Sequence, residues 1–260
     1  MINLDSALSG GFSRKRNLFS HVVEELGLRI VRGEFKPGAA LPNEAVLGIE
    51  YEVSRSVIRE AVKSLSAKGL IESRTRTGIR VRAPMHWNLL DPEVLRWRYS
   101  AMPPGQFFRE IFEIRGLIEP QAAALAAERA TRSEIADILS AYAAMEAAHE
   151  PGSSAISADL RFHRAVLAAA HNDLLLQMGN LIGVGLMVSY RLSSDSYTVF
   201  LPFHKEVAEA VAAHEPARAR DAMSRLLSST RAFLDKRLAR PRDGRRGAGG
   251  KRHSRATTPA

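Results

Sequence analysis

Three polar residues in the second half of the chain have the types and spacing of a metal site. Asp159 and His163 lie four residues apart, so a helix would place them on one face, and His204 follows near the start of a later helix. A carboxylate with two imidazoles suits a divalent cation. It equally suits a polar pocket for an oxygen-rich ligand, and Arg115, alone in an apolar stretch, is a further polar candidate.

A second group of polar residues begins a cationic helix in "VSRSVIREAVKSLSAKGLIE", residues 53–72. Apolar residues recur there in steps of three and four, which predicts one buried helix face. The first turn carries Ser54, Arg55 and Ser56, and Arg59 lies one turn further. This helix end can therefore approach an anionic partner closely.

The surrounding segments predict a winged helix-turn-helix. A helix is expected over residues 18–32, and a break with two Gly and two Pro follows it. Asn43 can cap a short second helix, and Ser54 the cationic third one, which Gly69 ends. Two short strands, "IES" and "IRV", then enclose a turn with Gly78 and form the wing.

Such a head binds DNA through its third helix, which fits the major groove. Arg55 and Arg59 would reach bases or phosphates, and Ser54 and Ser56 can bond to either. In the wing, we expect contacts from Arg74, Arg76, Thr77, Gly78 and Arg80. A two-fold homodimer of such heads would read a pseudo-palindromic operator in double-stranded DNA.

The segment "LPNEAVLGIEYEVSRSVIREAVKSLSAKGLIESRTRTGIRV" resembles the DNA-binding domain of GntR-family bacterial repressors. The shared frame is L-P-x-E, then V-S-R-x-x-(I/L)-R-E-A, then L-x-x-x-G-L-I-E, then a wing with glycine. Two positions depart from it: Ala45 replaces an arginine that often contacts DNA, and Arg76 replaces the first wing glycine. Both departures indicate an altered contact pattern.

Composition and charge agree with a DNA-binding protein that has a separate body. The formal net charge of +9 lies in the first 84 residues and in the last 21, while the segment between them is nearly neutral. The chain has no cysteine, which excludes disulfides and thiolate metal sites. No signal peptide or membrane span shows, so a cytoplasmic protein, nucleoid-associated through DNA, is expected.

The body is expected to be wholly helical, which gives a mainly α fold: a winged helix-turn-helix followed by an antiparallel bundle of six to seven helices. "TRSE" at 131–134 is a capping box, and one helix is predicted over 173–192. The expected organisation is an N-terminal arm (1–16), the DNA-binding head (17–84), a linker (85–104), a ligand-sensing domain (105–238) and a disordered basic tail (239–260).

The stretches "DLRFHRAVLAAAHND" and "HKEVAEAVAAHEPARARDAM" resemble the FadR-like (FCD) sensing domain of GntR regulators. That resemblance implies a divalent metal, such as Zn, Mn or Ni, held by one Asp and three His. Asp159, His163 and His204 match three of these ligands, and Leu226 stands where the fourth is expected. Either the effector completes a three-ligand metal site, or the pocket is purely polar.

"WNLLDPEVLRW", "EIRGLIEP" and "SSTR" look like repressors of sugar-acid operons, which implies an aldonate effector. Arg115 and Arg231 would then clamp its carboxylate. Its hydroxyls would bond to Asp159, His163, His204 and Ser229. The alternatives are a surface position for Arg231 and, for Arg115, a buried ion pair with Glu113 or Glu119.

The favoured hypothesis is therefore a transcriptional repressor that a small acid releases from its operator. Three alternatives remain: a metal-dependent enzyme that uses Asp159, His163 and His204, a regulator that responds to a different organic acid, and a nonspecific DNA-binding protein driven by its basic tail. No nucleophile or general base is evident beside the three polar residues, and an enzyme would leave the head unexplained.

Overall fold

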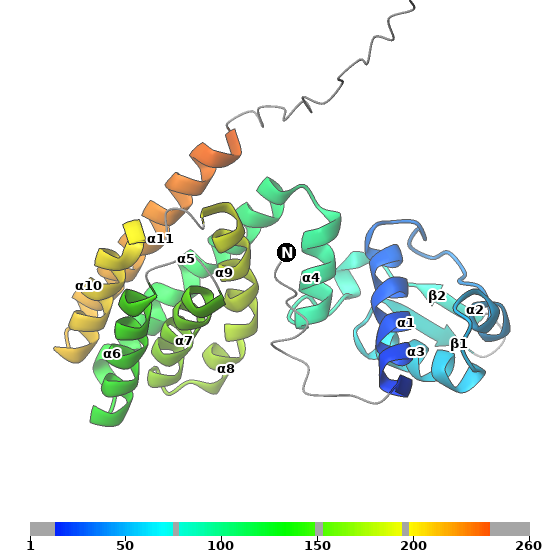
Figure 1. Ribbon diagram of the computed structural model, residues 1–260, viewed down its shortest axis with the longest axis horizontal. Coiled ribbons are helices and arrows are strands. Elements are labelled where there is room, and N and C mark those ends of the chain that lie inside the picture. The colour runs from blue at the N-terminus through cyan, green and yellow to red at the C-terminus, as the bar shows by residue number, and fades with distance from the viewer. Residues whose placement is uncertain (1–13, 75–77, 149–152, 194–197, 240–260) are drawn as a thin grey trace, which may run out of the picture.

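The protein forms two lobes joined by one short helix in a computed structural model (Figure 1). The structure describes residues 14–74, 78–148, 153–193 and 198–239. The predicted arm and tail lie outside these residues, except at their inner ends. The mainly α fold, with a winged helix-turn-helix and an all-helical body, is confirmed.

The head contains three helices and a two-stranded wing: α1 (Arg14–Val31), α2 (Glu44–Glu50), α3 (Arg55–Ala67), β1 (Ile71–Arg74) and β2 (Gly78–Val81). The strands are antiparallel, and Ile71 pairs with Val81. The Asn43 side chain accepts hydrogen bonds from the backbone N–H groups of Ala45 and Val46, which fixes the start of α2. Gly69 ends α3 with a φ of 77°, a conformation that a side chain would strain.

Within its described residues, the body contains seven α-helices: α5 (Pro104–Arg129), α6 (Arg132–Ala147), α7 (Ser153–Ala169), α8 (Asp173–Gln177), α9 (Gly179–Ser193), α10 (Leu201–Ala212) and α11 (Pro216–Ala239). Its core is rich in alanine, so the helices approach closely, and α5 packs along α11. The capping box at Thr131 and Glu134 is confirmed. None of the described helices is long and apolar enough to cross a membrane.

The single helix predicted over residues 173–192 is wrong, because it divides into α8 and α9. At the junction, the Met178 N–H bonds to the Leu175 carbonyl, a tighter spacing than that of an α-helix. Gly179, Gly183 and Gly185 follow, and glycine weakens a helix. The apolar periodicity extends across both helices, so it concealed the break.

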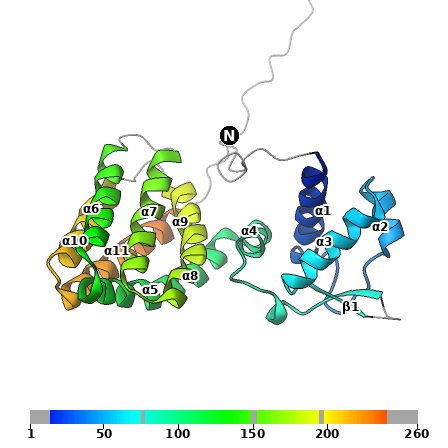
Figure 2. The same cartoon turned by 90° about the horizontal axis from the view of Figure 1, so that it is seen from below.

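Helix α4 (Pro92–Ala101) lies between the lobes and packs against both of them (Figures 1 and 2). Its Trp97 side chain is fully buried in the core of the head, whereas Leu95 is buried among residues of α5, α9 and α11 in the body. The sequence predicts a linker with a short helix here, with Leu95 and Trp97 packed between the domains, and the structure places that helix in two cores.

Polar contacts also attach α4 to the head. Asp91 caps α4 by accepting from the N–H groups of Glu93 and Val94, and its carboxylate lies 2.7 Å from the Lys68 ammonium at the end of α3. Lys68 also pairs with Glu93 at 2.6 Å, and Arg96 pairs with Glu24 of α1. The third helix of the head is therefore fastened to the helix that meets the body.

A testable consequence concerns Gly27 of α1, against which Trp97 packs. A Cβ atom at Gly27 would lie 2.6 Å from the indole ring. We expect Gly27→Ala to lower the free energy of unfolding by about 1–3 kcal/mol, because overpacking displaces the ring. Urea denaturation followed by circular dichroism measures this.

Gly116→Ala on α5 is the matched control, because a Cβ atom there meets nothing within 4 Å. It should be neutral or stabilise by up to about 1 kcal/mol. Unchanged stability for Gly27→Ala would contradict the close contact between α1 and α4.

Candidate nucleic-acid interface and metal centre

The start of α3 presents an exposed group of hydroxyl and guanidinium side chains. Ser54 occupies the N-cap position, yet its side chain makes no capping bond. Its Oγ lies 2.9 Å from Oγ of Ser56 instead. Arg55 and Arg59 are exposed as well. These four residues, all singled out in the sequence, are thus available at the surface.

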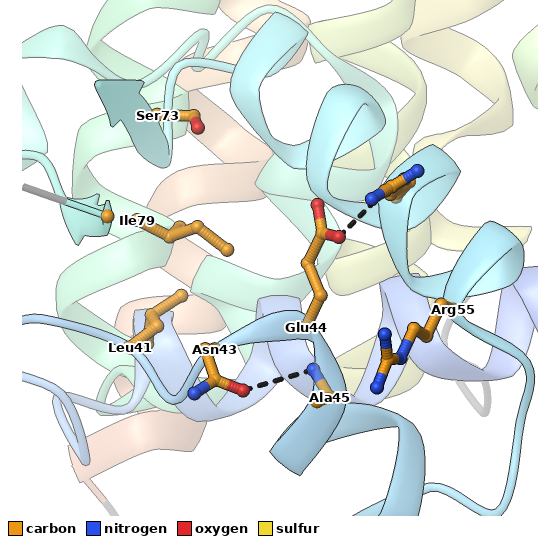
Figure 3. Close-up of a pocket in the computed structure, with 9 residues that line it drawn as sticks. Leu41, Asn43, Glu44, Ala45, Arg55, Ser73 and Ile79 are labelled. Atoms are coloured by element: carbon orange, nitrogen blue, oxygen red, sulfur yellow. Dashed lines mark hydrogen bonds and ion pairs between the residues drawn. The ribbon is translucent and has the colours of Figure 1, made fainter. Parts of the chain in front are cut away.

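An open hollow lies where α2, α3 and the wing meet (Figure 3). It is lined by Leu41, Asn43, Glu44, Ala45, Arg55, Arg59, Ser73, Gly78 and Ile79. The fold thereby brings both arginines of α3 together with Gly78 of the wing. Because Ala45 carries only a methyl group, Arg55 remains open to the hollow beside it.

Glu44 also lines this hollow, although the sequence assigned it no role. Its Oε2 lies 2.7 Å from Nε of Arg59, and the Arg59 side chain is 65% exposed. The hydrogen bond and the charge of Glu44 raise the pKa of Arg59. The L-P-x-E frame contained the only signal for Glu44, which orients Arg59 from the neighbouring helix.

The predicted wing contacts lie only partly within the described residues. The backbone of Arg74 ends β1, but its side chain and all of Arg76 and Thr77 lie outside the described part of the chain. Arg80 donates from Nη1 to the Gly38 carbonyl at 2.8 Å. That bond ties Arg80 to the loop after α1.

The three metal candidates converge in the body. Asp159 and His163 come from α7, and His204 from α10. Their ligand atoms all lie within 4.8 Å of one another, and both histidines are buried. Asp159 Oδ1 lies 3.4 Å from Nε2 of His163 and 3.3 Å from Nε2 of His204. The fold thus unites residues that are distant in the sequence.

Two further residues from α5 extend this cluster into a chain of buried charges. Glu119 Oε1 lies 2.5 Å from Nε of Arg115, and its Oε2 lies 2.5 Å from Nδ1 of His163. The solvent-exposed fraction of Arg115, Glu119 and His163 is at most 2% in each case. Of the two ion-pair partners that the sequence offered to Arg115, the structure selects Glu119, while Glu113 is exposed.

The hydrogen bonds of the two imidazoles suit a bound cation. Nδ1 of His204 donates to the Phe200 carbonyl at 2.8 Å, so its Nε2 presents a lone pair toward Asp159. That Nε2 atom and Asp159 Oδ1 are buried without a hydrogen-bond partner. Orphaned buried polar atoms are costly unless something satisfies them. A divalent cation held by Asp159, His163 and His204 fits this donor set.

Leu226, at the position where a fourth ligand was expected, is buried in the apolar core of the body. It supplies no donor atom, so the protein contributes three ligands, and the remaining positions of a cation would be open to small molecules. The three-ligand metal site and the purely polar pocket therefore both remain predictions.

The buried charged residues shift one another's pKa values. Burial alone would raise the pKa of Glu119, but Arg115 and His163 lower it to about 2. Burial likewise opposes ionisation of Asp159, yet the closeness of His163 and His204 lowers its pKa. For His163, burial is outweighed by Glu119 and Asp159, which raise its pKa to about 9.

Ser229 and Arg231 lie on α11, and they take no part in the contacts among the buried charges of Arg115, Glu119, His163 and Asp159. Arg231 is 39% exposed, and its Nε lies 3.8 Å from the Asp235 carboxylate. None of the described contacts of Ser229 or Arg231 reaches Arg115 or the three metal candidates. Their assignment to an effector site remains a prediction.

Comparisons with known proteins agree with the two-lobed arrangement. The family model "Bacterial regulatory proteins, gntR family" matches residues 18–81, and the FCD domain model matches residues 110–229. The galactonate operon transcriptional repressor of Escherichia coli is 41% identical over 162 residues, which cover 62% of this chain and 71% of the repressor.

Two more comparisons cover other parts of the chain. The Escherichia coli HTH-type transcriptional regulator YieP is 34% identical over 218 residues, 83% of this chain and 94% of that protein. A solved structure associated with Lar, which controls expression of the Listeria monocytogenes agr system, has a TM-score of 0.61 at 16% identity and covers 88% of this chain and 99% of its own. The latter likeness concerns the fold alone.

The raised pKa of His163 predicts how stability depends on pH in protein treated with a chelator. A folded pKa of about 9 exceeds the ordinary value of 6.5. The stabilisation is therefore fully present below about pH 6.5 and is lost as the pH rises through 9. Melting temperatures between pH 6 and pH 10 should fall across this window.

His163→Gln should remove most of that dependence, whereas His171→Gln, at a half-exposed position of the surface, should keep it. A flat profile for the unsubstituted protein would mean that His163 is not charged in the fold.

Proposed function

Because the chain belongs to the gntR family of bacterial regulatory proteins and carries an FCD domain, we propose that this DNA-binding transcriptional regulator is a homodimeric repressor that a sugar acid releases from its operator. Relatives named for the galactonate operon, the Uxu operon and the Exu regulon support the sugar-acid class. The family assignment accounts for the head, which a metal-dependent enzyme would leave unexplained.

The observation that carries the proposal is the convergence of α3 and the wing on one open hollow. Arg55 and Arg59 stand on successive turns of α3 and are exposed. An arginine fork matches the two acceptors of guanine in the major groove, and the hydroxyls of Ser54 and Ser56 match phosphate or base edges. Glu44 holds Arg59 in a defined orientation before DNA binds.

Two copies of the chain would read two half-sites about one helical turn apart, since a two-fold protein matches two-fold DNA. The basic residues of the predicted tail would add a nonspecific attraction to phosphate. Sequence discrimination in this arrangement belongs to α3 and the wing.

The sugar acid would bind in the body at the buried chain of charges. Asp159, His163 and His204 would hold a divalent cation, which supplies a Lewis acid for carboxylate and hydroxyl oxygens. Arg115 would bind the effector carboxylate from α5. Ser229 and Arg231 of α11 are the remaining candidates for contacts with the effector.

Substitutions in α3 test the DNA contacts. Arg55→Ala and Arg59→Ala should each cost about 1–3 kcal/mol of specific binding, because each removes a contact to a base edge. Fluorescence anisotropy at fixed salt, with a duplex selected from a random pool, measures the affinity. Lys63→Ala is the control, since Lys63 lies on α3 outside the hollow and pairs with Glu60.

Equal affinities for both arginine variants and the unsubstituted protein would refute the role of α3. Removal of residues 240–260 tests the alternative in which the basic tail drives DNA binding. If that alternative holds, the truncated protein loses affinity for specific and random duplexes alike.

A panel of aldonates and uronates tests the effector. An effector should raise the melting temperature of the protein and weaken its binding to the selected duplex, because it favours one arrangement of the heads. Repeating the panel with a chelator shows whether a cation takes part. If no sugar acid changes either measurement, another organic acid becomes the better proposal.

A further inference from the structure

Glu119 links the two halves of the buried chain, because each of its oxygens has a different partner. Oε1 pairs with Nε of Arg115 and Oε2 with Nδ1 of His163, both at 2.5 Å. The side chain is 2% exposed, so water does not replace either bond. A carboxylate in such a position acts on both the candidate metal centre and the candidate anion site.

At the metal centre, Glu119 fixes the orientation of His163. Its bond to Nδ1 turns Nε2 toward Asp159 Oδ1, 3.4 Å away. A histidine that ligates a metal commonly donates its other N–H group to a carboxylate, and loss of that partner weakens metal binding. Glu119 therefore favours a cation at Asp159, His163 and His204.

At the anion site, Glu119 has the opposite effect. It already balances the charge of Arg115 and occupies its Nε edge. A carboxylate from solution would share the guanidinium with Glu119, and two carboxylates repel each other strongly away from water. Without a cation nearby, Arg115 is a poor anion site despite its charge.

The backbone of α9 keeps Arg115 in this place. A Cβ atom at Gly185 would lie only 3.2 Å from Cδ of Arg115, so α9 passes directly over the arginine stem. The same Cβ atom would lie 2.5 Å from Ile111, so a larger residue at this position would require the Ile111 side chain to move. The close approach of α9 limits the space in which the Arg115 side chain can move.

We infer that Glu119 is a positioning residue that makes acid binding conditional on a cation: it strengthens cation binding by orienting His163 and weakens anion binding by neutralising Arg115. This inference rests on the proposed function, in which the body binds both. The two ligands then bind with positive cooperativity, since the cation offsets the repulsion that Glu119 exerts on the acid.

The test compares Glu119→Gln and Glu119→Asp with the unsubstituted full-length protein, and Glu113→Gln is the matched control on the exposed side of α5. Calorimetric titration with Ni²⁺ alone should show affinity about 10- to 100-fold lower for both Glu119 variants, since neither holds Nδ1 of His163 as a carboxylate at this distance does. Glu113→Gln should leave it unchanged.

The second measurement uses gluconate as the probe and chelator-treated protein. Glu119→Gln should gain affinity for gluconate on the order of tenfold, because Arg115 is no longer neutralised. Glu119→Asp keeps the charge and should stay at the level of the unsubstituted protein. If Glu119 had only a structural role, its replacement would weaken the binding of Ni²⁺ and of gluconate together. Circular dichroism is used to check that the variants are folded.

The outcomes separate this inference from the proposed function. If the unsubstituted protein binds Ni²⁺ but the Glu119 variants bind it equally well, the positioning role is overturned and the metal centre stands. If Glu119→Gln gains no affinity for gluconate, the effect on Arg115 is overturned. If the unsubstituted protein does not bind Ni²⁺ at all, the metal centre fails and this inference fails with it.

Discussion

The packing of α4 into two cores is the constraint on which the two-lobed structure depends. Trp97 packs against Gly27 of the head, and Leu95 is buried in the body, so one short helix contributes a side chain to the core of each lobe. A buried Trp contributes several kcal/mol to the core that holds it. Lys68 at the end of α3 is bonded to Asp91 and Glu93 at the start of α4. The end of α3 and the start of α4 are therefore joined by ion pairs.

The body follows a different principle, because its centre holds charges that apolar side chains would replace at less cost. Buried ion pairs seldom add stability, although breaking one leaves an uncompensated charge. Arg115, Glu119, His163 and Asp159 are each next to a group of opposite charge, which makes the cost tolerable. A core that keeps such a chain, with two polar atoms still unpartnered, is organised for binding rather than for stability.

Local signals in the sequence predict most of the fold, since caps and short periodicities act within one element. Asn43, Thr131 and Gly69 each mark a helix end that the structure contains. The break between α8 and α9 was missed because glycines within an apolar stretch do not interrupt its periodicity. The site was predicted in part: helical spacing pairs Asp159 with His163, but the bond between Glu119 and His163 depends on how α5 packs against α7. No pattern within one helix reports that packing.

The packing of α4 also connects the buried charges of the body to the head. Helix α9 packs against Arg115 at Gly185 and also against α4, so it connects the buried charges to the helix that enters the head. Between α4 and α5 the chain passes through Pro103, whose φ of −55° is fixed by its ring. A shift of α9 would therefore act on α4 and, through the Trp97 contact, on the head. In the proposed dimer, a small rotation of each head would change the separation of the two α3 helices. DNA whose half-sites lie one turn apart would bind only if that separation stayed nearly constant. Under the proposed function, an effector that bound one of two arrangements of the heads more tightly would control how much of the operator is occupied.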